Sequence, residues 1–250
     1  MPRFEFDNCW VEYEIGDCLE LMKDIPDKSI DLVLTDPPYG IGWDSEKPSM
    51  SAGLRKDGTR RKDKTWSKPK PKNYISGDWD NARLGKKFFE EMKRVSLTMI
   101  IWGANYYVDM IEPSGAWLVW DKKVPDGMSL SRCELAYCDR GGHTELFEYL
   151  WAGYKKHKPE PRYHPTQKPV ALFEWILNKY SNPGDTVLDP FLGSGTTLLA
   201  CRKTGRNGIG FEINPEYEPI IRKRIMADTK TIWQFGGDKN EKRARNDVQH

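Results

Sequence analysis

The sequence lacks several features that would assign it to other classes of protein. No run of 18 or more apolar residues occurs, so we expect no transmembrane helix. The opening stretch MPRFEFDNCW has no apolar core of signal-peptide length, which favours a cytoplasmic protein. The five cysteines form no CxxC pair, and the four histidines show no metal-ligand spacing. We therefore expect reduced, buried thiols and no metal site.

The length and composition favour a single large domain. The chain has 250 residues, of which 38% are hydrophobic, with 10 Trp and 11 Tyr, so it can bury a sizeable core. We expect one domain over residues 1–235, followed by a polar tail at 236–250.

Positive charge is concentrated in one segment, although the net charge of the chain is only +2. Between Asp44 and Lys72, ten Lys and Arg residues stand against four acids, which gives this segment +6 and leaves −4 for the rest. A long basic insert of this kind, taken as residues 44–73, is typical of a site for a polyanion and equally of a solvated loop.

Short β-branched and aromatic runs alternate with helical patterns along the chain. Strands are expected at Val11–Ile15, Ile30–Thr35, Thr98–Trp102, Ala116–Trp120, Cys133–Cys138, Thr186–Asp189 and Gly208–Ile213. Apolar Phe88, Met92 and Val95 recur at helical spacing. The stretch PVALFEWILNKY predicts a second helix, with Thr166 as a candidate N-cap and Pro169 in its first turn. Further helices are expected at 196–203 and 215–226.

This alternation predicts βαβ units and therefore a doubly wound α/β fold with a mostly parallel sheet. In such sheets ligands bind at the carboxyl ends of the strands, where the strand order reverses. Two unusual motifs, TDPPYG at 35–40 and DPFLGSGTT at 189–197, follow expected strands. We therefore expect both motifs at the ligand-binding edge of the sheet.

The glycine motif indicates a nucleoside-containing ligand. Gly193 and Gly195 allow a tight turn and close approach of a ligand, and the helix that follows directs free N–H groups toward it. Glu212 ends the next expected strand, where a carboxylate accepts hydrogen bonds from ribose hydroxyls. Leu198 stands where a dinucleotide site has its third glycine. S-adenosylmethionine, with a ribose but no pyrophosphate, fits these residues better than NAD.

With TDPPYG first and DPFLGSGTT last, the sequence resembles the β group of the amino-type DNA methyltransferases. Ile15-Gly16-Asp17-Cys18 is similar to the segment of that family whose Asp contacts the adenine of the cofactor. His164-Pro165-Thr166-Gln167-Lys168-Pro169 is similar to the HPTQKP element that precedes the helix beside its methionine end. Two further stretches, WGANYY at 102–107 and WLVWDK at 117–122, look like phage and prophage members. The resemblance covers about residues 11–227.

The resemblance implies a Rossmann-like methyltransferase fold with circularly permuted motif order, in a bacterial or phage-encoded protein that acts on double-stranded DNA. It implies catalytic roles for Asp36, Pro37, Pro38 and Tyr39. It implies S-adenosylmethionine as the cofactor, bound by Asp17, Cys18, Asp36, Thr166, Gln167, Lys168, Asp189, Phe191, Gly193, Ser194, Gly195, Thr196, Thr197, Glu212 and Ile213. The expected target-recognition region, residues 139–163, is short for the family, so the basic insert is a second candidate for that work.

The chemistry of amine methylation explains why TDPPYG has this composition. The exocyclic amine of adenine is a poor nucleophile, because its lone pair is delocalised into the ring. The Asp36 carboxylate and the Pro37 carbonyl can accept its two N–H bonds and free the lone pair. Tyr39 offers a face on which a flipped base can stack, which returns about 1–3 kcal/mol.

Three alternative functions compete with adenine-N6 methylation of DNA. Cytosine-N4 methylation is the nearest. Asp36 at the first position of the tetrad DPPY (residues 36–39) resembles the adenine enzymes, whereas cytosine-N4 members more often carry Ser there, and this preference has exceptions. A DNA-binding relic without turnover is a second, although Asp36, Tyr39 and Glu212 are all intact. Methylation of RNA or of a protein amide is a third, for which an N-P-P-Y tetrad is more usual. The sequence indicates neither the recognition site, nor the oligomeric state, nor whether a restriction endonuclease is a partner.

Overall fold

The structure, a computed structural model, describes residues 1–41, 80, 83–125, 131–152, 155–157, 161, 163–164 and 166–227. The predicted basic insert at 44–73 and the predicted tail at 236–250 lie outside the described residues. The predicted recognition region at 139–163 lies partly within them. In this described part, no helix combines the length and the apolar character that crossing a bilayer requires.

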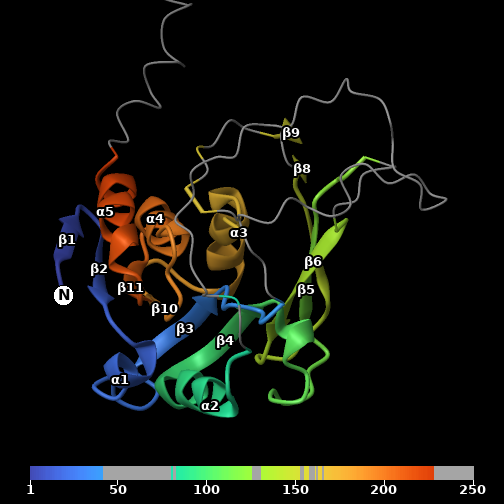
Figure 1. The fold of residues 1–250 in the computed structure, drawn as a ribbon, viewed down its shortest axis with the longest axis horizontal. Helices are drawn as coiled ribbons and strands as arrows, with labels where there is room; N and C mark the ends of the chain where they lie inside the picture. The colour runs from blue at the N-terminus through green and yellow to red at the C-terminus, as the bar shows by residue number, and fades with distance from the viewer. Residues whose placement is uncertain are drawn as a thin grey trace, which may run out of the picture.

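A nine-stranded mixed sheet forms the centre of the molecule (Figure 1). Its strands follow the order β1-β2-β11-β10-β3-β4-β6-β5-β7. They are β1 (Arg3–Phe6), β2 (Cys9–Ile15), β3 (Ile30–Thr35), β4 (Ser96–Trp102), β5 (Trp117–Asp121), β6 (Cys133–Cys138), β7 (Glu145–Glu148), β10 (Thr186–Asp189) and β11 (Asn207–Glu212). A separate two-stranded ribbon pairs β8 (Trp151–Ala152) with β9 (Lys155–Lys156). All seven predicted strands are present, with ends that differ by at most two residues.

The five central strands β2, β11, β10, β3 and β4 run parallel, as the alternation of elements predicts. Strand β3 is buried on both faces, with Leu32, Val33 and Leu34 all 0% exposed, which explains its continuous apolar run. Successive side chains point to opposite faces, so Leu32 and Leu34 join one core cluster and Val33 joins the other. Strands β6 and β1 are antiparallel additions to this central block.

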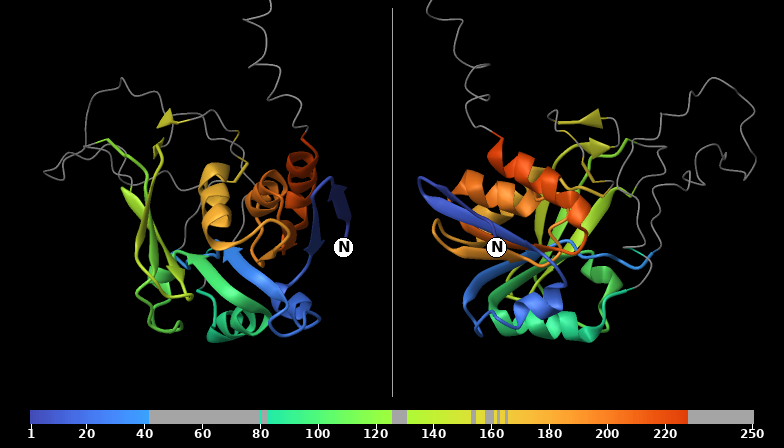
Figure 2. Two further views of the ribbon diagram at one scale, coloured as in Figure 1. Left: turned by 180° about the vertical axis from the view of Figure 1, so that it is seen from behind. Right: turned by 60° about the vertical axis from the view of Figure 1, so that its left-hand side comes forward.

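Helices cover both faces of the sheet (Figures 1 and 2). Figure 1 shows α3, α4 and α5 above the sheet and α1 and α2 below it. Their bounds are α1 (Cys18–Met22), α2 (Lys86–Val95), α3 (Val170–Tyr180), α4 (Thr196–Thr204) and α5 (Glu218–Met226). Two short 3-10 helices, η1 (Ala104–Tyr106) and η2 (Pro215–Tyr217), follow β4 and precede α5. Each face of the sheet therefore has its own hydrophobic core, as a doubly wound fold requires.

The start of α3 differs from the prediction. The N-cap is Pro169, with φ −67° and ψ 142°, and the helix begins at Val170. Thr166 lies too far ahead to cap it, and its hydroxyl contacts Nδ1 of His164 at 2.9 Å instead. The physical reason is Pro169 itself, because a proline disfavours helical geometry in the residue before it. Lys168 therefore lies outside the helix, and its side chain extends toward Asp36.

The apolar stripe of α2 also begins one residue later than predicted. Phe89, rather than Phe88, is buried with Met92 and Val95 against the sheet. Phe88 lies at the edge of the helix and contacts the ring of Phe191, with centroids 5.9 Å apart. The helix thus packs on the core with one face and borders the ligand-binding edge with another.

The strand order reverses between β3 and β10. These two strands are neighbours and parallel, with Leu32 opposite Val187 and Val33 opposite Leu188. The chain leaves β3 through α2 toward β4 on one side, and leaves β10 through α4 toward β11 on the other. The two connections diverge and open a crevice between the carboxyl ends of β3 and β10. TDPPYG and DPFLGSGTT both lie at this point, as predicted.

Candidate active site

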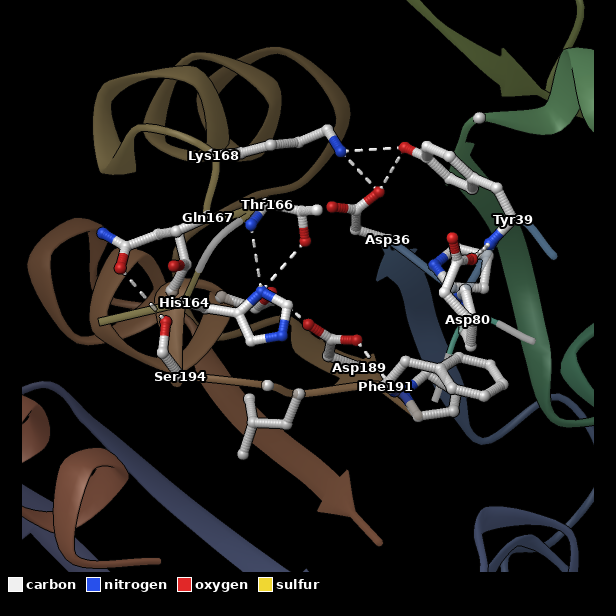
Figure 3. Close-up of a pocket in the computed structure, with 18 of the residues that line it drawn as sticks. Asp36, Tyr39, Asp80, His164, Thr166, Gln167, Lys168, Asp189, Phe191 and Ser194 are labelled. Atoms are coloured by element: carbon white, nitrogen blue, oxygen red, sulfur yellow. Dashed lines mark hydrogen bonds and ion pairs between the residues drawn. The ribbon is translucent and has the colours of Figure 1, made fainter. Parts of the chain in front are cut away.

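A cavity of about 1090 Å³ opens at the reversal point of the sheet. Residues from both sequence motifs line it, together with residues that follow β2, β5 and β11. Every residue that the sequence marks as a candidate site residue lines this cavity except Gly195. Gly195 is instead the N-cap of α4, with φ +82°. Figure 3 shows lining residues that come from segments far apart in the sequence.

The backbone of the TDPPYG loop is held by Asp80, which no motif indicates, and by Tyr107, the last residue of WGANYY. Asp80, itself 3% exposed, accepts hydrogen bonds from the backbone N–H groups of Tyr39 and Gly40 at 2.7 and 2.8 Å. The hydroxyl of Tyr107 donates to the carbonyl of Pro38. The prolines supply no donors of their own, so these contacts fix the loop through the groups that remain. A single Asp in a polar stretch leaves no recognisable sequence signal.

The Asp36 carboxylate, which is 21% exposed, lies in a partly buried cluster of charged and hydroxyl groups (Figure 3). The Tyr39 hydroxyl donates to Oδ1 of Asp36 at 2.6 Å, and Nζ of Lys168 forms an ion pair with the same oxygen. Nζ of Lys168 also donates to the Tyr39 hydroxyl at 3.0 Å and lies 3.2 Å from Oε2 of Glu134. Burial raises the pKa of Asp36, and the adjacent Lys168 opposes that rise.

The ring of Tyr39 lies in an aromatic stack at the same end of the cavity. Its centroid is 5.0 Å from that of Tyr106, with 20° between the ring planes. Gly103 lies directly against the ring, because a Cβ at this position would be 1.9 Å from Cε1 of Tyr39. Gly103 has φ +65°, which suits glycine and no bulkier residue. The stretch WGANYY thus supplies both Gly103, which leaves room for the Tyr39 ring, and Tyr106, whose ring stacks on that of Tyr39.

At the other end of the cavity the glycine loop is joined to Glu212. The backbone N–H of Gly193 donates to Oε2 of Glu212 at 2.7 Å, and that of Asn214 donates to Oε1 at 2.9 Å. Gly193 has φ +54°, so the turn uses the conformational freedom that the sequence predicts. Burial raises the pKa of Glu212 to about 7. The carboxylate keeps lone pairs free to accept further donors from a ligand.

Asp189 connects the two motifs. The Thr35 hydroxyl donates to its Oδ1 at 2.6 Å, and the backbone N–H of Phe191 donates to the same oxygen at 3.1 Å. The Thr197 hydroxyl donates to Oδ2. Burial raises the pKa of Asp189 to about 6, although these hydrogen bonds oppose the rise. The first residue of TDPPYG is therefore bonded to the first residue of DPFLGSGTT.

Arg224, on α5, stabilises the glycine loop through hydrogen bonds. It is not among the site residues that the sequence predicts. Its guanidinium is buried and donates to the backbone carbonyl and hydroxyl of Ser194, both at 2.8 Å, and to the Thr196 hydroxyl at 3.1 Å. A signal for it does exist in the sequence. Arg224 follows Ile221 by three residues and precedes Ile225, so it lies on the apolar face of its helix.

Asp17 and Cys18 line the cavity at the start of α1. Asp17 is the N-cap of that helix and accepts a hydrogen bond from the backbone N–H of Leu19 at 2.8 Å. The backbone N–H of Gly16 donates to the carbonyl of Glu212 at 2.9 Å, which ties this corner to β11. Burial raises the pKa of the Cys18 thiol to about 12, so the thiol remains protonated at neutral pH.

His164, Thr166 and Gln167, from the described part of HPTQKP, line the cavity beside the glycine loop. Oε1 of Gln167 accepts from the backbone N–H of Tyr163 at 2.8 Å and from the Ser194 hydroxyl at 3.4 Å. Thr166 contacts His164, as described above. Within the part of the chain that the structure describes, His, Cys, Asp and Glu side chains form no group of three able to hold a metal ion.

A polar ligand suits this cavity. Tyr217 lines the cavity, and its hydroxyl is buried with no hydrogen-bond partner among the described residues. An unpartnered buried hydroxyl is costly, and a ligand that accepts or donates a hydrogen bond removes that cost. Free carboxylate lone pairs of Glu212 and the N-terminus of α4 offer further polar contacts.

Comparisons with known proteins agree with this architecture. Residues 30–223 match the N6_N4_Mtase family, described as DNA methylase. The type II methyltransferase M.HpaI of Haemophilus parainfluenzae is 28% identical over 261 aligned positions, which cover 93% of this chain and 79% of that protein.

Two solved structures share the fold at low sequence identity. The M1.HpyAVI-SAM complex matches with a TM-score of 0.52 and 22% identity, covering 86% of this chain and 99% of that one. The cytosine-N4-specific PvuII DNA methyltransferase matches with a TM-score of 0.54 and 17% identity, covering 90% of each chain. Because the family match spans most of the chain and the fold agrees, this protein belongs to the N6/N4 DNA methylase family.

Proposed function

We propose that this protein transfers a methyl group from S-adenosylmethionine to the N6 amine of an adenine flipped out of double-stranded DNA. One observation carries the proposal: the Asp36 carboxylate, with Tyr39 bonded to it, lies in the same cavity as the glycine loop and Glu212. An amine-activating group and a nucleoside-binding loop thus share one enclosed space.

The glycine-loop end of the cavity is the proposed cofactor site. Glu212 accepts hydrogen bonds from the ribose hydroxyls, and Asp17 and Ile213 lie beside the adenine. The N–H groups at the start of α4, with Thr166 and Gln167, receive the methionine end. S-adenosylmethionine bound here supplies the methyl group on a sulfonium sulfur. These assignments agree with the unpartnered Tyr217 hydroxyl, which a polar ligand can engage.

The other end is the proposed site of the target base. Asp36 and the Pro37 carbonyl accept the two N–H bonds of the amine, which localises its lone pair toward the methyl carbon. The aromatic faces of Tyr39 and Tyr106 receive the flipped base, whose extrusion costs a few kcal/mol. The residues hold the amine in line with the methyl group, and this positioning supplies much of the rate. The proton leaves afterwards, to Asp36 or to water.

The target base is the finer part of the proposal. Asp36 at the first position of the tetrad supports adenine, and cytosine-N4 methylation is the alternative. The experiment is to incubate the purified protein with DNA and labelled S-adenosylmethionine, hydrolyse the DNA and identify the labelled nucleoside. We expect N6-methyladenosine in its deoxy form. Label found only on N4-methylcytosine contradicts the adenine assignment and leaves the amine mechanism intact.

Asp36→Ala is the matched variant for this assay. We expect it to bind S-adenosylmethionine as the unaltered protein does, since Glu212 and the glycine loop are unchanged. Methyl transfer should fall at least about 100-fold, the range seen when one preorganised electrostatic contact is removed. Calorimetry measures cofactor binding, and label incorporation measures transfer. Near-full activity in this variant would refute the mechanism. Parallel assays with RNA and protein acceptors test the remaining alternatives.

The DNA-reading surface and any partner endonuclease are further proposals. Recognition is assigned to residues 139–163 and to the basic insert at 44–73, because neither belongs to the catalytic motifs. Mapping methylated positions in DNA from cells that express the protein would give the recognition sequence. Methylation at scattered, unrelated sites would contradict a site-specific enzyme.

A further inference from the structure

The ammonium group of Lys168 lies at the catalytic end of the cavity. Figure 3 shows its side chain extending toward Asp36 and Tyr39. Its side chain is only 3% exposed, and Nζ contacts Asp36, the Tyr39 hydroxyl and Oε2 of Glu134. A buried ammonium needs carboxylate partners, because burying an unpaired charge is very costly. Lys168 therefore belongs to the immediate surroundings of Asp36.

Glu134, on β6, is the second carboxylate of this cluster and carries no sequence motif. Its Oε2 lies 3.2 Å from Nζ of Lys168, and its Oε1 pairs with Nζ of Lys122. Burial raises the pKa of Glu134, but Lys168 and Lys122 outweigh burial and hold that pKa below its ordinary value. Glu134 is thus an ionised carboxylate that lines the cavity beside the candidate catalytic group.

The ion pair between Lys168 and Asp36 conflicts with the reaction proposed above. The target amine must donate to the Asp36 carboxylate, yet one oxygen of that carboxylate already holds both Lys168 and Tyr39. The amine nitrogen also gains positive charge as it takes the methyl group. A cation in contact with the same carboxylate opposes that charge, most strongly where water is excluded. Departure of the ammonium group from Asp36 before transfer would remove this opposition.

We propose that Lys168 is a movable counter-ion, which neutralises Asp36 before the target base binds and shifts to Glu134 when the target amine arrives. This inference rests on the proposed role of Asp36. Glu134 already lies within ion-pair distance of Nζ, so a small rotation of the Lys168 side chain completes the exchange. Both are positioning residues: no covalent bond forms or breaks on either. The pair keeps a partly buried aspartate ionised without leaving a cation beside the reacting nitrogen.

The proposal makes opposite predictions for the two residues. Removing the Lys168 cation should raise the pKa of Asp36, because burial then acts with less opposition. Removing the Glu134 anion should lower it, because a neighbouring negative charge disfavours ionisation. The charged and titratable groups that face Asp36 are Lys168 ahead of α3, Glu134 from β6 with Lys122 behind it, Tyr39 from its own loop, and Asp189 from β10.

The first experiment measures the Asp36 pKa without any substrate. Protein labelled with 13C at the aspartate carboxyl carbons is titrated by NMR, and Asp36→Asn identifies the resonance. We expect the pKa to rise by about one unit or more in Lys168→Met and to fall in Glu134→Gln, one unit being a tenfold change in proton affinity. Lys179→Met, which removes a surface ion pair of α3 with Glu145, is the matched control and should change neither.

The second experiment follows methyl transfer to DNA as a function of pH. In Lys168→Met the acid limb of the rate profile should move to higher pH, with activity recovered in alkaline buffer, and Lys168→Arg should restore the limb. In Glu134→Gln the ammonium stays on Asp36, so the KM for DNA should rise about tenfold while the acid limb moves to lower pH. Lys168→Gln replaces the Met variant if that variant does not fold.

The two readouts separate the inference from the proposed function. An Asp36 pKa that is unchanged in Lys168→Met, or that moves the same way in both variants, overturns the counter-ion proposal whatever the transfer assay gives. Absence of methyl transfer by the unaltered protein, with the opposite NMR shifts intact, contradicts the proposed function and supports the charge coupling.

Discussion

A single missing side chain decides where Tyr39 lies. At Gly103, φ is +65° and an added Cβ would be 1.9 Å from the Tyr39 ring. Gly103→Ala should displace the ring from Asp36 and strain the backbone by about 1–2 kcal/mol. We expect methyl transfer to fall at least about tenfold, since misplacing a reacting group is costly. Cofactor binding at the other end of the cavity should persist. Label incorporation and calorimetry measure the two effects.

Gly85→Ala is the control for that variant. Gly85 is the N-cap of α2, has an extended backbone conformation, and has nothing within 4 Å of an added Cβ. It should retain nearly full methyl transfer. Equal losses in the two variants would mean that the alanine acts through general stability and not through Tyr39.

Glu212 should make cofactor binding depend on pH near neutrality. Because burial raises its pKa to about 7, the Glu212 carboxyl group titrates near neutral pH in the free protein. Donors from ribose hydroxyls favour the ionised form and lower that pKa, so binding should release protons and weaken as the pH falls below 7. Calorimetry in buffers of different ionisation heat measures the release. The Glu212→Gln variant should bind the cofactor more weakly and lose most of the proton release. Unchanged proton release in that variant would mean that another group releases the protons.

Helix α5 shows how one element supports another. Arg224 reaches from it to Ser194 and Thr196, where the glycine loop enters α4. The loop therefore keeps its shape through a contact 30 residues away in the sequence.

Removing that brace should affect both stability and cofactor binding. Arg224→Gln leaves buried acceptors at Ser194 without their donor, which should lower the free energy of unfolding by about 2 kcal/mol and weaken cofactor binding. Lys223→Gln, at the adjacent exposed position of the same helix, should change neither. Denaturant unfolding and calorimetry test the pair. Cofactor affinity unaffected by Arg224→Gln would show that the loop holds its shape without α5.

The elements that the sequence predicts best are those with the strongest local pattern. Strands β3 and β10 are short, largely apolar runs; β3 is followed directly by Asp36-Pro37, and β10 ends at Asp189 and is followed by Pro190. The sequence predicts both with their observed bounds. Strand β7 was missed, because its four residues alternate over a half-exposed surface and give only a weak signal. The N-cap of α3 was wrong because the conformational restriction by Pro169 outweighs the capping preference of Thr166.

Across the whole chain, positive charge is concentrated in the basic insert, and the remaining residues carry a net negative charge. Residues 44–72 carry +6, against −4 for the rest of the chain. DNA binding by the intact protein should therefore weaken steeply with salt, because each phosphate contact releases counterions. Deleting residues 44–73 should reduce the slope of log K against log salt by several units and weaken binding.

Fluorescence titration of a DNA duplex at several salt concentrations measures that slope. A charge-neutral replacement of the lysines and arginines in the insert, at constant length, is the matched control and should act like the deletion. An unchanged slope in both would show that the insert takes no part in DNA binding, and recognition would then fall to residues 139–163.

The sequence by itself determined the α/β class, the two motifs and their place at strand ends, because local periodicity and turn-forming residues act over short distances. It also indicated a set of candidate site residues, all of which line the cavity except Gly195. Only the tertiary structure decided which side chains meet. Asp80, Glu134 and Arg224 reach the site from segments that carry no motif, since contacts between residues distant in sequence depend on how those segments pack. The partners of Lys168 were likewise set by packing, because Pro169 turns the chain before α3 and leaves its ammonium group beside Asp36.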